Sequence, residues 1–196
     1  MPGLPRAILF DMDGTITEPM LDFPRIKREM GIGQRPILEA LAEMSASARQ
    51  IAEAVLLRHE EEAAANSVLN PGCIELLNWL DRHRIGMAVI TRNSRLNVET
   101  VCRKHDLKFE VVITREDGKF KPDPAPLLEA CRRLGAGTSD VWMVGDGQYD
   151  VEAGLAAGIA TVWVSHGRIK PFAAEPDWVV QGLHELTAML EGCLNR

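Results

Sequence analysis

The stretch Ala7-Ile8-Leu9-Phe10-Asp11-Met12-Asp13-Gly14-Thr15 joins a short apolar run to two acidic residues and a glycine. Four consecutive apolar residues are typical of a strand that is covered on both faces, as in a parallel sheet. The run stops abruptly at Asp11, so the polar residues lie at the carboxyl end of the predicted strand. In open parallel sheets, ligands bind outside the carboxyl ends of the strands. We therefore predict a functional loop at residues 11–15.

Short apolar runs alternate with helical patterns along most of the chain. Further strands are predicted at Gly86 to Ile90, Phe109 to Ile113, Val141 to Val144 and Ile159 to Val164. Helices are predicted between them at Ile74 to His83, Arg95 to His105, Ala125 to Leu134 and Tyr149 to Ala157. A last helix, Leu183 to Leu194, is expected to pack on an edge. This order predicts right-handed crossovers and an α/β fold with a doubly wound parallel sheet.

Residues 17–70 interrupt this alternation, because they carry helix-forming stretches and no strand pattern. These stretches are Phe23 to Met30, Pro36 to Met44 and Ala46 to Leu69. Asn70-Pro71-Gly72 then marks a turn. We predict an α/β core domain of residues 1–16 and 71–196 and a small helical cap of residues 17–70. The charged run from Arg58 to Glu62 is interpreted as a solvated helix face.

Composition narrows the class of protein. The 196 residues are 46% hydrophobic and 26% charged, which is typical of a soluble globular protein. The net charge of −6 gives no electrostatic footprint for nucleic acid or an anionic membrane. No apolar stretch approaches the roughly 18 residues that cross a bilayer, and no signal-peptide core follows Met1. We expect a cytoplasmic protein whose four widely spaced cysteines are reduced.

Polar residues follow four of the predicted strands. They are Asp11-Met12-Asp13-Gly14-Thr15, Thr91-Arg92-Asn93, Lys121-Pro122-Asp123-Pro124 and Gly145-Asp146-Gly147-Gln148-Tyr149-Asp150. Each segment alone has a plainer interpretation, as a polar turn, a helix cap or a solvated loop. Because the carboxyl ends of parallel strands meet at one edge of a sheet, we expect these residues to lie together.

Phosphoryl transfer is the chemistry that needs such a cluster. A carboxylate can attack a phosphate ester only if positive charge offsets the repulsion between the two anions. Mg²⁺ prefers oxygen ligands, which Asp11 and Asp146 can supply, and Lys121 adds a fixed positive charge. Donors to the phosphoryl oxygens are expected from Thr91 and from the backbone amides near Gly14 and Asn93.

The spacing of the first two acids suggests their roles. In an extended segment, Asp11 and Asp13 point the same way, so both can face one substrate. We predict that Asp11 is the nucleophile, because an aspartyl-phosphate divides one difficult displacement into two easier ones. Asp13 can then protonate the departing alcohol and later activate water.

Together these segments resemble the four motifs of the haloacid dehalogenase (HAD) superfamily, in the same order and over essentially the whole chain. The resemblance implies a Rossmann-like core, Mg²⁺ as cofactor and an aspartyl-phosphate intermediate. It implies metal contacts from Asp11, the main-chain carbonyl of Asp13 and Asp146, with Asp150 in a supporting contact. From the positions of the residues, we expect the catalytic groups at Asp11, Asp13, Thr91 and Lys121, and substrate contacts at Gly14, Thr15, Arg92 and Asn93.

The helical insert, Asn70-Pro71-Gly72 and Lys121-Pro122-Asp123-Pro124 resemble the phosphoglycolate-phosphatase-like branch of this superfamily. Dehalogenases of the superfamily lack an acid two residues after the nucleophile, so Asp13 argues against dehalogenation. This sequence departs from the usual pattern at Glu18-Pro19, at Gly147 and in the short length of the insert. These departures affect the expected substrate and leave the catalytic set complete.

The sequence therefore predicts a Mg²⁺-dependent phosphatase whose partner is a small phosphorylated metabolite, in a monomer or homodimer. A sugar phosphomutase of the β-phosphoglucomutase type, which uses the same aspartates, is an open alternative. A non-catalytic HAD-fold binding protein is the other. Outside the motifs, the early cap cations Arg25, Lys27 and Arg28 are interpreted as a solvated helix face, and His166 as a loop residue without chemistry.

Overall fold

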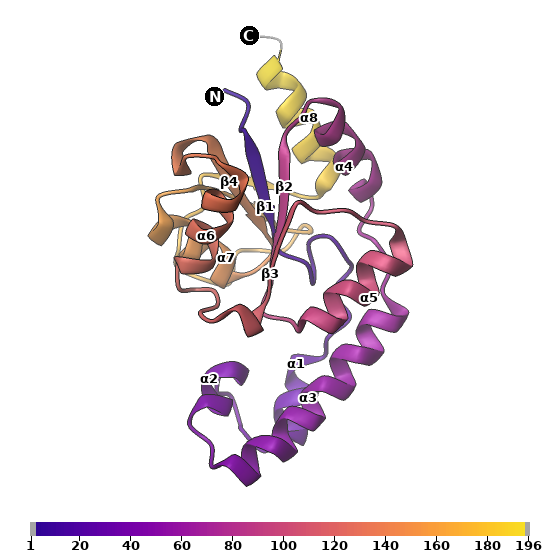
Figure 1. Ribbon diagram of the computed structural model, residues 1–196, viewed down its shortest axis with the longest axis vertical. Helices are drawn as coiled ribbons and strands as arrows, with labels where there is room; N and C mark the ends of the chain where they lie inside the picture. The colour runs from indigo at the N-terminus through magenta and orange to yellow at the C-terminus, as the bar shows by residue number, and fades with distance from the viewer. Residues whose placement is uncertain (1–2, 195–196) are drawn as a thin grey trace.

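The computed structural model describes residues 3–194, which form a six-stranded parallel sheet between two layers of helices (Figure 1). The strands are β1 (Ala7–Phe10), β2 (Gly86–Ile90), β3 (Val111–Ile113), β4 (Val141–Gly145), β5 (Ala160–Val164) and β6 (Trp178–Val180). Their order in the sheet is β3-β2-β1-β4-β5-β6. The chain thus winds outward in one direction from β1 and in the other from β4. The prediction of a doubly wound α/β fold is confirmed.

The two faces of β1 pack against different helices, which explains why every residue of this strand is apolar. Ile8 and Phe10 belong to one buried cluster, and Ala7 and Leu9 belong to another. The first face is covered by α4 (Cys73–Arg82), α5 (Arg95–His105) and α8 (Leu183–Leu194). The second face is covered by α6 (Ala125–Leu134) and α7 (Gln148–Ala157).

Three features differ from the sequence predictions. Strand β6 was missed, because it has three residues and Val179 at its centre is 55% exposed, which leaves too short a pattern to detect. Strand β3 begins at Val111 instead of Phe109, and two short 3₁₀ helices cover Arg115–Asp117 and Thr138–Asp140. Helix α8 packs beside α4 (Figure 1) and also contacts the edge strand β6, as the sequence predicts.

Residues 17–70, called the cap segment below, contain the helices α1 (Phe23–Glu29), α2 (Ile37–Ala42) and α3 (Ala46–Asn66). These helices lie beyond the carboxyl end of the sheet (Figure 1). Ile26, Leu41 and Leu56 are among the residues of a hydrophobic cluster that is separate from the two sheet clusters. The long helix α3 also packs against α5 of the sheet layer.

The chain enters and leaves the cap segment through two adjacent antiparallel stretches. The amide of Glu18 donates to the carbonyl of Val68 at 2.9 Å, and the amide of Asn70 donates to the carbonyl of Ile16 at 2.9 Å. The buried side chain of Asn70 also donates to the carbonyls of Gly14, Thr15 and Thr17, at 3.1, 2.8 and 2.9 Å. Asn70 therefore ties the exit from the cap segment to the loop that follows β1.

One prediction about α3 is wrong. The run from Arg58 to Glu62 is not a uniformly solvated face, because Glu60 is buried at 4% exposure. Its carboxylate is bound by Arg115, which lies after β3. The charge pattern could not distinguish Glu60 from its exposed neighbours, since burial here depends on the docking of α3 against the sheet layer.

No helix within residues 3–194 has the length and apolar character needed to span a bilayer.

Candidate active site

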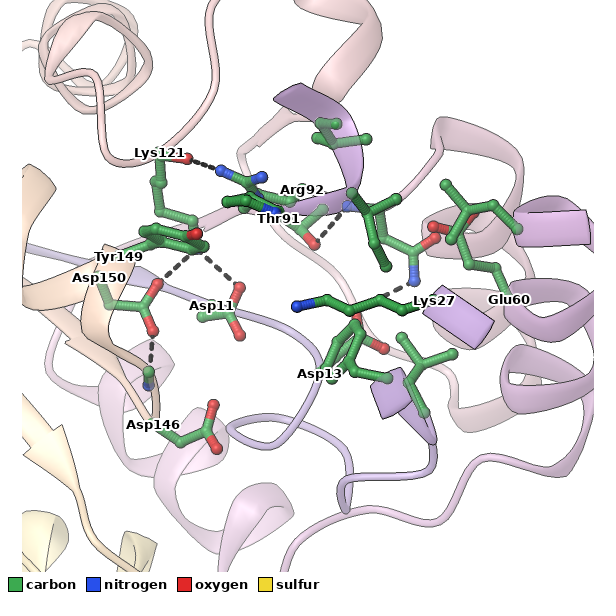
Figure 2. A pocket seen from close by; sticks show the side chains of 18 residues that line it. Asp11, Asp13, Lys27, Glu60, Thr91, Arg92, Lys121, Asp146, Tyr149 and Asp150 are labelled. Atoms are coloured by element: carbon green, nitrogen blue, oxygen red, sulfur yellow. Dashed lines mark hydrogen bonds and ion pairs between the residues drawn. The ribbon is translucent and has the colours of Figure 1, made fainter. Parts of the chain in front are cut away.

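The ends of the central strands open into a cavity of about 340 Å³ between the sheet and the cap helices (Figure 2). Asp11 follows β1, and its amide donates to the carbonyl of Val144 at 2.9 Å, so the ends of β1 and β4 are directly connected. The predicted site residues that line the cavity are Asp11, Asp13, Thr91, Arg92, Asn93, Lys121, Asp146 and Asp150. Gly14 and Thr15 were predicted to contact substrate, but they do not line it.

Lys121 connects two of these acids. Its side chain is 2% exposed, and Nζ lies 2.7 Å from Oδ1 of Asp11 and 2.7 Å from Oδ1 of Asp150. Burial alone would lower the pKa of Lys121, but the charges of Asp11 and Asp150 outweigh it and raise the pKa. Lys121 is therefore a permanent positive charge that fixes the orientation of both carboxylates.

Asp11 lies where negative charge exceeds positive charge. Burial raises the pKa of Asp11 well above its ordinary value of 3.8, and only Lys121 opposes this effect strongly. The neighbouring carboxylates of Asp150, Asp13 and Asp146 raise the pKa further. Burial and the charge of Asp150 likewise raise the pKa of Asp146. Additional positive charge beside these acids would favour their ionised forms and lower their pKa values.

Asp13 points to a different part of the cavity. Its Oδ2 accepts a hydrogen bond from Nδ2 of Asn93 at 3.0 Å. Asn93 is itself fixed, because its amide donates to Oγ1 of Thr91 at 3.0 Å and its Oδ1 accepts from the amide of Ser94 at 2.7 Å. Burial raises the pKa of Asp13, although the bond from Asn93 opposes the rise. A raised pKa suits a carboxyl group that must give up and take back a proton.

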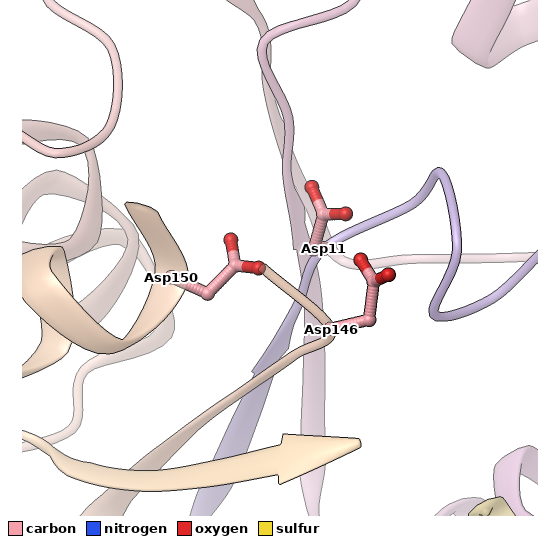
Figure 3. A group of neighbouring side chains, drawn as sticks. All are labelled: Asp11, Asp146 and Asp150. Atoms are coloured by element: carbon pink, nitrogen blue, oxygen red, sulfur yellow. The ribbon is translucent and has the colours of Figure 1, made fainter. Parts of the chain in front are cut away.

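Asp11, Asp146 and Asp150 each offer a carboxylate oxygen, and these three oxygens lie within 4.8 Å of one another (Figure 3). Hard oxygen donors of this kind suit Mg²⁺, and a divalent cation would supply the charge that the acids lack. The side chain of Asp13 is not part of this group. Asp150 is also bound by Lys121 and by the amide of Gly147 at 3.0 Å. The residues present thus fit the magnesium ion that the family resemblance implies.

Gly14 makes the close approach of two strand ends possible. Its φ of +89° lies in the left-handed region, which disfavours residues with a Cβ. A Cβ at this position would lie 2.6 Å from the carboxyl group of Asp146. Thr15 beside it is fully buried, and its Oγ1 has no hydrogen-bond partner among the residues described. The structure therefore places Gly14 directly beside Asp146 and buries Thr15 next to it.

Arg92 joins the site to the cap segment. Its guanidinium donates to both carboxylate oxygens of Glu39 on α2, at 3.0 and 2.8 Å, and also to the carbonyl of Lys121. The same group lies over the rings of Phe120 and Tyr149, 4.7 and 4.3 Å from their centroids. The positive charge of Arg92 is thus already paired. Glu39 carried no signal in the sequence, since its role depends on where α2 docks.

Strand β5 and the loop after it supply contacts that the sequence did not predict. Nε2 of His166 lies 2.7 Å from the carbonyl oxygen of Gly14. Arg168 donates to Oδ2 of Asp146 at 2.9 Å, and the indole of Trp163 donates to its carbonyl at 2.9 Å. The strand-end rule would have identified His166 and Arg168, because they follow a predicted strand as the other site residues do.

Of the three early cap cations, the structure brings one into the cavity. Lys27 lines it, whereas Arg25 and Arg28 do not. Arg25 pairs with Glu29 of the same helix at 2.8 Å, and Arg28 is exposed. The interpretation as a solvated face thus fits Arg25 and Arg28 better than Lys27.

Comparisons with known proteins agree with this geometry. A sequence model of the family described as "Haloacid dehalogenase-like hydrolase" matches residues 17–164. The chain is 30% identical to a haloacid dehalogenase-like hydrolase domain-containing protein of Arabidopsis thaliana, over 95% of this chain and 84% of the relative. It is 30% identical to phosphoglycolate phosphatase 1 of Pseudomonas aeruginosa, over 93% of this chain and 79% of the relative.

The fold also has a close counterpart among solved structures. A hydrolase from Pseudomonas syringae matches the structure with a TM-score of 0.81, 18% identity, and coverage of 95% of this chain and 98% of the other. At that identity the likeness concerns the fold alone. The family match over residues 17–164 and the two relatives at 30% identity carry the assignment. The chain belongs to the haloacid dehalogenase-like hydrolase family and is an enzyme of that family.

Proposed function

We propose that this hydrolase is a Mg²⁺-dependent phosphatase that cleaves small phosphomonoesters through an aspartyl-phosphate on Asp11. One observation carries the proposal: Lys121 holds Asp11 and Asp150 at 2.7 Å each, beside Asp146 and at the base of the cavity. A largely buried carboxylate with a fixed cation on one side and further acids on the other is arranged for phosphoryl transfer. The phosphoglycolate phosphatase among the relatives supports the same class of reaction.

In the first step, a carboxylate oxygen of Asp11 attacks the phosphorus atom and the bond from phosphorus to the ester oxygen breaks. The departing alkoxide takes the proton of Asp13, so an alcohol leaves and Asp13 becomes a carboxylate. The raised pKa of Asp13 supports this role, because the group keeps its proton up to a higher pH than an ordinary aspartate does. Thr91 and Asn93 line the same cavity and can donate to the phosphoryl oxygens.

In the second step, the carboxylate of Asp13 takes a proton from water, and the resulting hydroxide attacks the phosphorus of the acyl phosphate. The bond from phosphorus to the oxygen of Asp11 breaks, which restores the Asp11 carboxylate and releases inorganic phosphate. Asp13 is again protonated, and the sum of both steps is one ester and one water converted to one alcohol and one phosphate.

A magnesium ion held by Asp11, Asp146 and the main-chain carbonyl of Asp13, with Asp150 in support, would offset the negative charge of the phosphoryl group. Lys121 keeps Asp11 oriented for attack and contributes a second positive charge. We further propose that the cap segment (residues 17–70) covers this site and selects the leaving group. Small esters such as 2-phosphoglycolate are the proposed substrates.

The test is release of inorganic phosphate from a panel of small phosphomonoesters, with Mg²⁺ and with EDTA. We expect turnover that requires Mg²⁺ and is lost in Asp11→Asn, while circular dichroism shows the variant folded. A parallel assay follows interconversion of hexose phosphates. Isomerisation of a hexose phosphate with negligible free phosphate would make the enzyme a phosphomutase, and full activity of Asp11→Asn would exclude Asp11 as the nucleophile.

A further inference from the structure

The cap side of the cavity is lined mainly by apolar side chains. Six of them contribute: Leu21, Phe23, Pro36, Ile37, Leu38 and Leu56. An apolar wall favours an apolar body on the part of a ligand that contacts it. The cavity volume of about 340 Å³ lies in the range of small-molecule sites, roughly 300–1,000 Å³, and leaves room for a leaving group larger than a few atoms.

Among residues 3–194, three cationic side chains line the cavity, and two of them are already paired. Lys121 is bound by Asp11 and Asp150. Arg92 is bound by Glu39. Lys27 makes one hydrogen bond, at 3.3 Å to the carbonyl oxygen of Gln34, and has no ion pair with any residue described between 3 and 194.

Lys27 is positioned to use its charge inside the cavity. It is half-buried on α1, and Figure 2 shows its side chain extended into the cavity with the ammonium directed toward the region of Asp11. Glu60 also lines this side, but Arg115 binds its carboxylate at 2.5 and 2.9 Å, so its charge is compensated. Within the described part of the chain, the cap side of the cavity thus combines an apolar wall with one cation that lacks an anionic partner.

We propose that Lys27 binds a second anionic group, carried by the leaving group of the substrate. The preferred substrates are then phosphomonoesters whose leaving group has an apolar body and a negative charge, such as a carboxylate. This inference rests on the proposed phosphatase function and adds a residue and a substrate class to it. Lys27 acts on specificity, and the phosphoryl group itself is bound at Asp11 and Lys121.

The experiment compares two esters of the same shape, 4-carboxyphenyl phosphate and 4-carbamoylphenyl phosphate, which differ in the charge of one group. Lys27→Met removes the ammonium and keeps most of the length of the side chain. We expect kcat/KM of Lys27→Met to fall roughly tenfold on the carboxylate ester, mainly through KM, because a hydrogen bond to a charged group is lost. On the amide ester we expect a change of less than about twofold.

Two further variants complete the design. Arg28→Met removes the same charge from the next residue of the helix, which is exposed and does not line the cavity. We expect it to match the wild type on both esters. Lys27→Arg keeps the positive charge, so we expect it to retain the preference for the carboxylate ester. Thermal melts of all three variants check that each is folded.

The outcomes separate this inference from the proposed function. Equal losses of kcat/KM on both esters in Lys27→Met would mean that Lys27 binds the transferred phosphoryl group. No loss on either ester would mean that Lys27 does not bind the substrate. Either result overturns the inference about Lys27 and leaves the phosphatase function intact. If the wild type acted on 2-phosphoglycolate but on neither aryl ester, the inferred preference for a leaving group with an apolar body would be overturned. No phosphate release from any ester by the folded wild type would overturn the proposed function itself.

Discussion

Arg115 donates two hydrogen bonds to the carboxylate of Glu60, at 2.5 and 2.9 Å, and so joins the segment after β3 to the longest helix of the cap segment. The side chain of Glu60 is 5% exposed and that of Arg115 is 18% exposed. Burial raises the pKa of Glu60 despite the opposing effect of Arg115. Together with the pair between Arg92 and Glu39, this contact fixes how the cap helices sit over the cavity.

The first prediction concerns this buried pair. Glu60→Ala leaves the charge of Arg115 unpaired, so we expect a loss of about 3 kcal/mol in the free energy of unfolding, measured in urea. Glu60→Ala combined with Arg115→Ala should cost clearly less than the sum of the two single changes. Glu53→Ala on the same helix breaks an exposed pair with Arg49 and should cost about 0.5 kcal/mol or less. Strict additivity would mean that Glu60 and Arg115 do not interact.

The second prediction concerns Gly14. Gly14→Ala and Gly33→Ala both place a Cβ at a positive φ, of +89° and +60°, and each should lose about 1 kcal/mol of stability. Only the Cβ at position 14 meets another group, the carboxyl group of Asp146 at 2.6 Å; nothing lies within 4 Å of the one at position 33. We therefore expect Gly14→Ala to weaken Mg²⁺ binding about tenfold or more, as measured by calorimetry. Equal Mg²⁺ affinity in the two variants would contradict the arrangement of Gly14 and Asp146.

The third prediction concerns pH. In the metal-free protein the pKa of Asp13 is raised above its ordinary value of 3.8, chiefly by burial. A carboxyl group with a raised pKa binds its proton more tightly in the folded state, so its contribution to stability is lost as the pH rises through the folded-state pKa. Asp13→Asn should therefore stabilise the metal-free protein relative to wild type at neutral pH, and much less near pH 3.8. Urea unfolding with EDTA at several pH values measures the difference.

Asp123 provides a control of opposite sign. Its pKa is lowered, first by the hydrogen bond from Lys119 and then by the bond from the amide of Ala125. A lowered pKa contributes stability above the unfolded-state pKa, and this contribution is lost as the pH falls. Asp123→Asn should therefore be destabilising at neutral pH and less so in acid. If both variants changed stability in the same direction with pH, the burial of Asp13 would not have the effect described.

Much of the architecture could be predicted because it depends on local patterns. Continuous apolar runs identified five of the six strands, and their ends located the residues that the structure brings to one cavity, Asp11, Thr91, Lys121 and Asp146 among them. Strand β6 was missed because its three residues form no recognisable pattern. Gly14 was expected to contact the substrate. In the structure, the absence of a Cβ at this position leaves space for the carboxyl group of Asp146.

The contacts between the cap segment and the sheet layer could not be predicted in the same way. Arg92 with Glu39, and Arg115 with Glu60, join residues that are 53 and 55 positions apart in the chain. Each pair forms only because α2 and α3 dock over the carboxyl end of the sheet. No local periodicity in the sequence predicts that docking. Lys27 is the same case, since its neighbours Arg25 and Arg28 share its charge and helix but not its position in the cavity.

The covalent role of Asp11 is tested most directly by trapping the intermediate. The enzyme is quenched in acid during turnover of a small phosphomonoester with Mg²⁺, and its peptides are mapped by mass spectrometry. We predict one added phosphoryl group on the peptide that contains Asp11, absent in Asp11→Asn and absent with EDTA. Steady release of phosphate with no phosphorylated peptide, together with an active Asp11→Asn enzyme, would contradict the account.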